Sequence, residues 1–321
     1  MYTAMRERYA GTIIKSIKPM RYLIYMLIMC AAILLVYDLG EDSSEAEYDE
    51  IEKLLKSSQN HTNTASIKKI ISSINDKNSF SFVVLGDNRG NLKMFKKILR
   101  SVRNEKPDFI LHTGDLTRDG NLSEYKSMMK IVGQYDIPIV FAPGNHDIKN
   151  YGTESFLHFI GPLNFFFDIG PYRFIILDNA GEDVDSEFAE LPKDDAKKYS
   201  VSHGLDDYQV QTLEKLLLEK NKSFIVMHLP PPLRELNFRS FDRDSSKFID
   251  MAKKHRDRII KIFCGHIHGY AKTLQDGVQY IITAGAGADL TKSKPGLTGK
   301  FNYVLVRISG DSIIHEVKYY D

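Results

Sequence analysis

Five short segments of the chain carry acidic, amide or imidazole side chains directly after apolar runs. They are Gly86-Asp87, Gly114-Asp115, Gly144-Asn145-His146-Asp147, His228 and Gly265-His266-Ile267-His268. Taken singly, a Gly-Asp pair in this position is usually a turn or a helix cap, and a lone histidine is more often structural than a ligand. Together, oxygen and imidazole ligands that converge on one place match what a first-row transition metal requires.

The carboxylates narrow the chemistry further. Carboxylates gathered closely repel each other unless a cation lies between them. Asp115 has two oxygens and can bridge two metal ions about 3.5–4 Å apart, the separation used for in-line displacement at phosphorus. The residue types therefore point to metal-assisted chemistry on a phosphate group.

Alternating apolar runs and amphipathic segments would position these residues. The pattern predicts strands over 80–85, 109–111 and 137–141, separated by helical spacing over 92–102 and 125–132. This β-α-β-α-β order predicts parallel strands joined by right-handed crossovers. In open sheets of this kind ligands bind at the carboxyl ends of the strands, where the polar segments fall.

The second half of the chain has more antiparallel character. A hairpin is predicted over 165–177, a helix over 206–218, and strands over 224–227, 259–263, 280–283, 301–308 and 312–319. His228 follows one of these strands, and the segment that begins at Gly265 follows another. Residues 180–205 and 230–247 show no regular pattern.

In this order the five segments resemble the motifs of the calcineurin-like metallophosphoesterases. Those motifs are D-x-H, G-D, G-N-H-D/E, a strand-end histidine and G-H-x-H, and four of the five match over residues 80–320. The resemblance implies an α/β fold, a four-layer αββα sandwich in which two β-sheets lie between helices. It also implies hydrolysis of a phosphate ester, either a phosphomonoester or a phosphodiester.

The resemblance implies a ligand set for one or two divalent transition metal ions per chain, Mn, Fe or Zn. The first metal would be held by Asp87, Asp115 and His268, and the second by Asp115, Asn145, His228 and His266. His146 would act as a catalytic, substrate-binding residue that protonates the leaving oxygen or holds a phosphoryl oxygen, while a metal-bound hydroxide attacks phosphorus.

The first motif departs from the family pattern, because Arg89 stands where a histidine is usual. The purple acid phosphatase branch also lacks that histidine and has a tyrosine three residues after the bridging aspartate instead. This chain has Arg118 at that position, so the tyrosine is absent too. A guanidinium ~5 Å from a dication would be repelled by roughly 7 kcal/mol at an effective dielectric of ~20.

Two orientations of Arg89 follow from this repulsion. Either the side chain turns away to pair with an acid, or it points inward and the first metal binds weakly or not at all. In the inward case the planar guanidinium can hold a phosphate oxygen, which makes Arg89 a candidate catalytic and substrate-binding residue. Residues two apart at a strand end project to the same side, which favours the inward orientation.

Composition excludes several other classes of function. The chain has 321 residues with 43 basic and 42 acidic side chains, so no global field indicates nucleic-acid binding. Its two cysteines, Cys30 and Cys264, lie far apart in sequence, so a disulfide framework is not expected. The composition indicates no particular oligomeric state.

The N-terminal part has the pattern of a membrane anchor. Residues 22–37 contain no charged side chain, and residues 22–39 are predicted to be a transmembrane signal anchor. Residues 1–21 form a short basic tail, 40–79 a polar linker, and 80–321 the metallophosphoesterase domain. The alternatives are a cleaved signal peptide and a buried core helix, but no small-x-small cleavage site follows the apolar run.

These features predict a single-pass membrane protein with a cytoplasmic N-terminus and an extracytoplasmic, metal-dependent phosphoesterase domain. A rival hypothesis is a catalytically silent module that keeps the fold and binds a phosphorylated ligand or partner; Arg89 is the feature that favours it. A third is a secreted soluble hydrolase, which differs only in the processing of residues 1–40.

The distribution of charge around the apolar segment generates a prediction about topology. Five basic residues precede residue 22, whereas eight acidic and no basic residues occupy 38–52, and basic flanks stay cytoplasmic. A reporter that is active only outside the cytoplasm, fused after residue 321, should therefore be active. A mature N-terminus found by protein sequencing between residues 30 and 60 would contradict the uncleaved anchor.

Overall fold

The computed structural model describes residues 61–74, 79–150, 152–181, 204–220, 222–236, 241, 245–293 and 295–320. The predicted basic tail, the anchor over 22–39 and linker residues 40–60 lie outside these ranges. Within the described ranges, none of the helices combines the length and the apolar character needed to cross a membrane.

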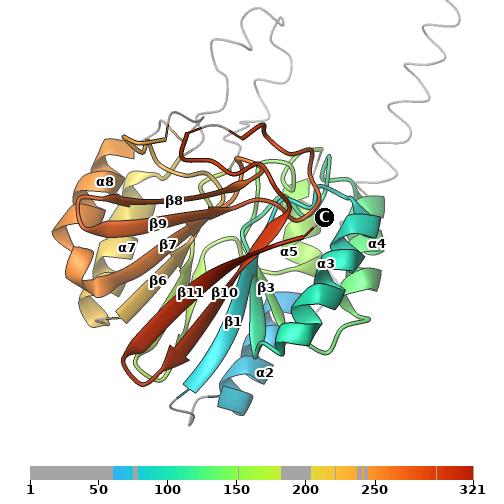
Figure 1. Ribbon diagram of the computed structural model, residues 1–321, viewed down its shortest axis with the longest axis horizontal. Coiled ribbons are helices and arrows are strands. Elements are labelled where there is room, and N and C mark those ends of the chain that lie inside the picture. Colours follow the sequence, from blue (N-terminus) through green and yellow to red (C-terminus); the bar gives the residue numbers. More distant parts are fainter. Residues whose placement is uncertain are drawn as a thin grey trace, which may run out of the picture. The chain divides into compact units, whose positions relative to one another are not determined.

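The first sheet has five strands in the order β11-β10-β1-β2-β3 (Figure 1). Their bounds are β1 Ser79–Leu85, β2 Phe109–His112, β3 Ile139–Phe141, β10 Asn302–Ser309 and β11 Ser312–Tyr319. Strands β1, β2 and β3 are parallel, and α3 (Leu92–Glu105) and α4 (Leu122–Val132) connect them. The predicted β-α-β-α-β order is thus confirmed, and β10 and β11 extend the sheet in antiparallel pairing.

The second sheet has six strands in the order β4-β5-β6-β7-β9-β8. Their bounds are β4 Phe165–Ile169, β5 Tyr172–Ile176, β6 Lys222–Val226, β7 Ile259–Cys264, β8 Tyr270–Gln275 and β9 Val278–Thr283. The four central strands are parallel, and β4 and β8 close the two edges in antiparallel pairing. Helices α7 (Asp207–Glu219) and α8 (Ser245–Lys254) join β5 to β6 and β6 to β7.

Aromatic side chains fill the space between the two sheets. Phe82 of β1 packs against Phe224 of β6 with ring centroids 5.4 Å apart, and Phe174 of β5 stacks on Phe224 at 5.0 Å. Because side chains alternate along a strand, Val83 and Leu85 face the opposite side of the first sheet. Both faces of the central strands are therefore buried, as is usual for parallel strands covered on two sides.

Helices cover the outer face of each sheet. Phe95 of α3 and Tyr125 of α4 pack on the first sheet, together with α5 (Gly152–Phe159). Leu213 of α7 and Phe248 of α8 pack on the second sheet. Figure 1 shows α7 and α8 on one side of the strands and α3 and α4 on the other, so the arrangement is helix, sheet, sheet, helix.

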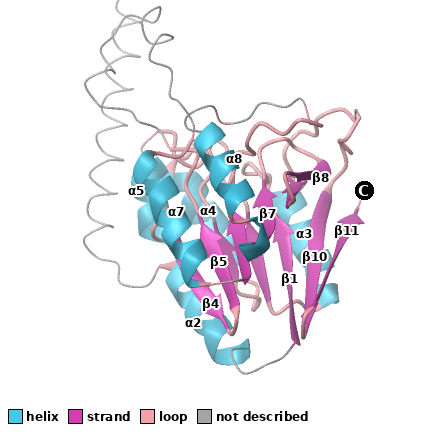
Figure 2. Cartoon of the chain, turned by 90° about the vertical axis from the view of Figure 1, so that its left-hand side faces the viewer, coloured by secondary structure: helices cyan, strands magenta, loops and turns pink. Residues whose placement is uncertain are grey.

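Helix α2 (Thr62–Ile74) corrects the predicted polar linker over 40–79. Ile70 and Ile74 are fully buried in the core between the sheets, and α2 lies against β3 and β4 (Figure 2). Asn63 exchanges two hydrogen bonds with the backbone of Phe141, at 3.0 and 2.8 Å. The prediction was wrong here because α2 covers a sheet edge with a narrow apolar stripe, while most of its remaining positions are serine, threonine, lysine or asparagine.

Two neighbouring isoleucines test whether α2 belongs to the folded domain. Ile70→Ala should lower the free energy of unfolding by about 2–4 kcal/mol, because it leaves a cavity in the core between the sheets. Ile71→Ala is the matched control, since Ile71 is 37% exposed, and it should cost less than about 1 kcal/mol. Urea unfolding of the full chain measures both; equal effects would show that α2 is not part of the core.

Candidate metal centre

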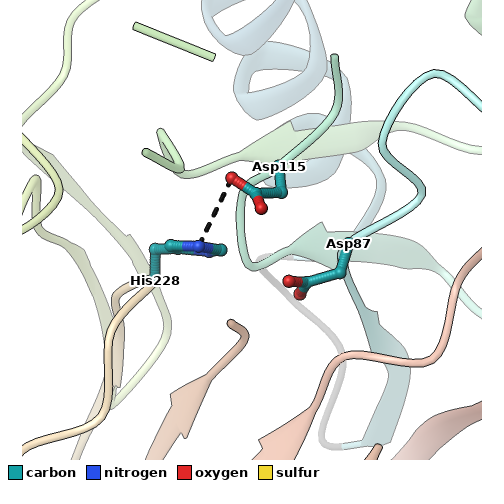
Figure 3. Close-up of side chains that lie close together, drawn as sticks. All are labelled: Asp87, Asp115 and His228. Carbon is teal, nitrogen blue, oxygen red and sulfur yellow. Dashed lines mark ion pairs between the residues drawn. The ribbon is translucent and has the colours of Figure 1, made fainter. Parts of the chain in front are cut away.

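The loops that follow β1, β2, β3, β6 and β7 bring the five polar segments to one edge of the paired sheets. Figure 3 shows the carboxylates of Asp87 and Asp115 and the imidazole of His228 side by side. One ligand atom from each of these three side chains lies within 4.8 Å of the other two, and all three residues are buried. This buried Asp-Asp-His group fits the dimetal site that is typical of metallophosphoesterases.

The backbone at this edge adopts conformations that side chains normally disfavour. Within the described ranges eight non-glycine residues have positive φ, and five of them belong to the predicted site: Asp87 (63°), Arg89 (44°), Asp115 (57°), His266 (69°) and His268 (50°). Such conformations cost free energy and cluster at functional sites, where the surrounding structure enforces them. The fold therefore aims these side chains at one place despite the local cost.

The four residues expected around the second metal are linked by a chain of close contacts. The Nε2 atom of His228 is 3.3 Å from Oδ1 of Asp115 and 3.0 Å from Oδ1 of Asn145. The Nδ1 atom of His266 is 3.2 Å from the same Asn145 oxygen and 3.3 Å from Nε2 of His228. Two oxygens and two nitrogens thus converge, which is a donor set that divalent transition metals accept.

Backbone carbonyls fix the orientation of two histidines. The Nδ1 atom of His228 donates to the carbonyl of Thr113 at 2.8 Å, and Nδ1 of His268 donates to the carbonyl of Asp289 at 2.8 Å. A carbonyl can only accept, so Nδ1 of each ring carries a proton and Nε2 is the nitrogen available to a metal ion. These Nε2 atoms face Asp115 and Asp87 respectively, the arrangement that metal-ligating histidines use.

Asp87 offers a buried oxygen that a bound cation would satisfy. Its Oδ1 accepts from the backbone N–H of His266 at 2.9 Å and lies 3.6 Å from Nε2 of His268. Its Oδ2 is buried and has no hydrogen-bond partner among the described residues. Burial and the neighbouring charge of Asp115 raise the pKa of Asp87 well above its usual range. A positive ion next to Oδ2 would satisfy this oxygen and reverse the shift.

His146 and Arg89 lie beside this ligand set. The backbone N–H of His146 donates to Oδ1 of Asp115 at 2.9 Å, and its ring contacts Nη2 of Arg89, 2.8 Å from Nδ1. Nε of Arg89 is 3.6 Å from Oδ2 of Asp115, so the side chain has the inward orientation. Burial lowers the pKa of His146, although the charge of Asp115 opposes this. The structure thus brings all eight predicted site residues together.

Sequence reasoning missed a pair of residues that joins the two aspartate loops. His112 is fully buried, and burial lowers its pKa to about 3, so its ring is neutral. Its Nε2 donates to Oδ1 of Asn88 at 2.9 Å, and its Nδ1 accepts from the N–H of Gly114 at 3.2 Å. Asn88 in turn donates to the carbonyl of Leu116 at 2.7 Å. The signal available in the sequence was a histidine at a strand end, three residues before Asp115.

Asp147 has a comparable supporting role in the third segment. Its Oδ1 accepts from the N–H of Thr117 at 2.8 Å, and its Oδ2 accepts from the N–H of Gly144 at 2.9 Å. Burial, together with the charge of Asp115, raises the pKa of Asp147 to about 7. Asp147 therefore ties the loop that carries Asn145 and His146 to the loop that carries Asp115.

A hollow of about 500 Å³ opens next to His146 and Arg89. Arg118, Asp119, Glu124 and Asp289 also line it, so its surface is mainly polar and charged. A hollow of this size beside the aspartates and histidines has room for a small phosphorylated molecule.

Comparison with known proteins agrees with this geometry. The family model described as calcineurin-like phosphoesterase matches residues 80–270. A serine/threonine-protein phosphatase CPPED1 from Rattus norvegicus is 27% identical over 238 residues, which cover 68% of this chain and 69% of the relative.

Two further proteins show the same relationship. A probable glycerophosphodiester phosphodiesterase GpdQ from Arcobacter nitrofigilis is 25% identical over 189 residues, which are 56% of this chain but only 63% of that relative's length. The crystal structure of a dimetal phosphatase from Danio rerio superimposes with a TM-score of 0.60 at 14% identity, covering 75% of this chain and 96% of that one. At that identity the superposition shows the fold alone.

Replacement of His112 tests whether it positions the aspartates. His112→Leu leaves Oδ1 of Asn88 and the N–H of Gly114 without this partner, which should cost about 1–3 kcal/mol of stability for each group. It should also weaken Mn²⁺ or Zn²⁺ binding about 10–100-fold, the usual effect of removing a group that supports metal ligands.

His255→Leu is the matched control, because His255 is also buried and bonds to Glu214 at 2.8 Å in another part of the fold. It should lower stability and leave the metal affinity unchanged. Calorimetric metal titration and urea unfolding separate the two effects, and equal metal affinities in the two variants would contradict the positioning role.

Proposed function

The chain belongs to the calcineurin-like phosphoesterase family, and from that premise we propose that it hydrolyses a phosphate ester in a metal-dependent reaction. The observation that carries the proposal is the convergence of Asp115, Asn145, His228 and His266, which are linked through His228 and Asn145 by contacts of 3.0–3.3 Å. A protein without metal chemistry would gain nothing from gathering these side chains at a buried, strained edge of its sheets.

The proposed roles follow from the positions of the side chains. Asp115, Asn145, His228 and His266 hold one metal ion, and Asp87 and His268 extend the set from the other side of Asp115. Bound Mn, Fe or Zn supplies an activated water and neutralises charge on the phosphoryl group. His146, at the mouth of the hollow, holds a phosphoryl oxygen or gives a proton to the leaving oxygen. Arg89, which contacts His146, binds phosphoryl oxygen.

The substrate class in this proposal covers phosphomonoesters and phosphodiesters. One relative carries the name of a protein phosphatase and another that of a glycerophosphodiester phosphodiesterase, so the family relationship supports both types of ester. The experiment that tests the function is a screen of chromogenic mono- and diesters with purified protein and added Mn²⁺, Zn²⁺ or Fe²⁺.

A second candidate is a catalytically weak or silent module that binds a phosphorylated ligand or partner. The observation that favours it is the inward Arg89, whose charge lies where the family usually places a neutral metal ligand. Binding of inorganic phosphate with no turnover of any ester in the screen would support this candidate over the enzyme.

We extend the proposal to location. The segment 22–39, in which residues 22–37 carry no charge, anchors the protein in a membrane. The basic residues before it keep the N-terminus in the cytoplasm, so the phosphoesterase domain lies outside it. The acidic composition of residues 38–52 supports the same orientation.

Two histidine variants should separate metal binding from catalysis. His228→Ala removes a ligand, so it should lose most of the bound metal and nearly all activity. His146→Ala should keep its metal and lose rate by roughly 10²–10⁴, as expected for a general acid. Elemental analysis and hydrolysis rates measure both, with chelation and metal restoration of the wild type as the reference. Near-normal turnover in His228→Ala would show that the site is assigned wrongly.

A further inference from the structure

The two oxygens of Asp115 face different groups. Oδ1 lies 3.3 Å from Nε2 of His228 and accepts from the backbone N–H of His146 at 2.9 Å. Oδ2 lies 3.6 Å from Nε of Arg89. A carboxylate that bridges two cations presents one oxygen to each of them. Here one oxygen faces the imidazole ligands, and the other faces a guanidinium.

Arg89 is held in this position by its own backbone. Its N–H donates to the carbonyl of Asp115 at 2.9 Å, and its φ of 44° turns the residue toward the site. The side chain is only 26% exposed, its Nη2 contacts His146, and its buried Nε has no hydrogen-bond acceptor among the described residues. The guanidinium is therefore a fixed part of the centre, with donor capacity that the protein itself leaves unused.

The charge of Arg89 lies directly beside the carboxylate that both metals would share. Its Nε is 3.6 Å from Oδ2 of Asp115, whose Oδ1 faces His228. A ligand atom of Asp115 lies within 4.8 Å of one of Asp87. A dication placed between Asp87 and Oδ2 of Asp115 would therefore be repelled by the guanidinium.

A single ion can still use both carboxylates. Asp87, Asp115 and His228 each offer one ligand atom within 4.8 Å of the others, so one ion can contact all three. One dication and the guanidinium carry three positive charges, and the two carboxylates carry two negative charges, so the centre has an excess of one positive charge. Two dications would raise that excess to three at a buried site, which is unfavourable without further anions.

We propose that Arg89 replaces the first metal ion, so that the centre holds one metal beside a guanidinium that binds a phosphoryl oxygen. The phosphoryl part of this inference rests on the proposed function, whereas the metal count does not. The planar guanidinium of Arg89 presents parallel N–H donors that match two oxygens of a phosphate. Its Nη2 group, which contacts His146, and the adjoining hollow place such a phosphate next to His146.

Metal content tests the first half of the proposal. The full chain, saturated with Mn²⁺ or Zn²⁺ and dialysed, should carry about one metal ion per chain in the wild type and in Arg89→Lys, which keeps the charge. Arg89→His, which restores a neutral ligand, should carry about two. Arg118→Gln is the matched control, since Arg118 is an exposed arginine that lines the same hollow, and it should stay at about one.

Several outcomes would overturn the metal count. Two ions in the wild type, no ion in the wild type, or the same content in wild type and Arg89→His would each reject it, as would two ions in Arg118→Gln. Arg89→Gln serves as a second variant if circular dichroism shows that Arg89→His is misfolded; it should bind a second ion more tightly than the wild type does. A wild type that carries one metal ion per chain but hydrolyses no ester would reject the proposed function instead, and the metal count would stand.

Inorganic phosphate tests the second half. Calorimetric titration of protein loaded with one metal ion per chain should show that Arg89→Gln weakens phosphate binding about 10–100-fold, as expected for the loss of charge-assisted hydrogen bonds. Arg118→Gln should weaken it less than about threefold. Equal affinities in wild type and Arg89→Gln would reject the assignment of Arg89 as the phosphate ligand.

Discussion

The mutual repulsion of Asp87 and Asp115 is the constraint on which the rest of the centre depends. Both carboxylates are buried, and the pKa of Asp87 rises because burial and its neighbour disfavour a second negative charge. Burial alone would raise the pKa of Asp115 too, but the nearby His228 and His146 lower it overall. Such a pair is stable only beside positive charge, which bound metal and the guanidinium of Arg89 can supply. The imidazoles, the amide of Asn145 and the hollow are arranged around that requirement.

The two-sheet scaffold holds these groups together by burying both faces of its parallel strands. Phenylalanines between the sheets and aliphatic or aromatic side chains under the helices leave little freedom for the strand ends. That rigidity can maintain positive φ at Asp87 and Asp115, and hydrogen bonds from His112 and Asp147 tie the ligand loops to one another. Helix α2 closes the open edge beside β3, so residues before the matched family segment contribute to the same core.

In the proposed one-metal centre, Arg89 changes the chemistry without changing the fold. The other residues of the candidate centre lie together, and the fold superimposes on that of a dimetal phosphatase. A guanidinium cannot activate water as a metal ion does, but it can neutralise and orient a phosphoryl group at a fixed position. Exchange of one cation for the other would therefore preserve substrate binding more readily than nucleophile activation. The enzyme and the silent binding module differ in whether the centre activates a nucleophile.

The sequence predicted the order of strands and helices over residues 80–141 and the residues that gather in the candidate metal centre. Both depend on local spacing, because a polar Gly-Asp or Gly-His pair directly after an apolar run is recognised without knowledge of the tertiary structure. Helices α2, α5 and α8 and strand β8 were not predicted, since their burial depends on partners far away in sequence, as with Asn63 and Phe141. The inward side chain of Arg89 and the link between His112 and Asn88 were likewise decided by tertiary structure. Each depends on backbone geometry and on a neighbour from another strand, which spacing along the chain does not encode.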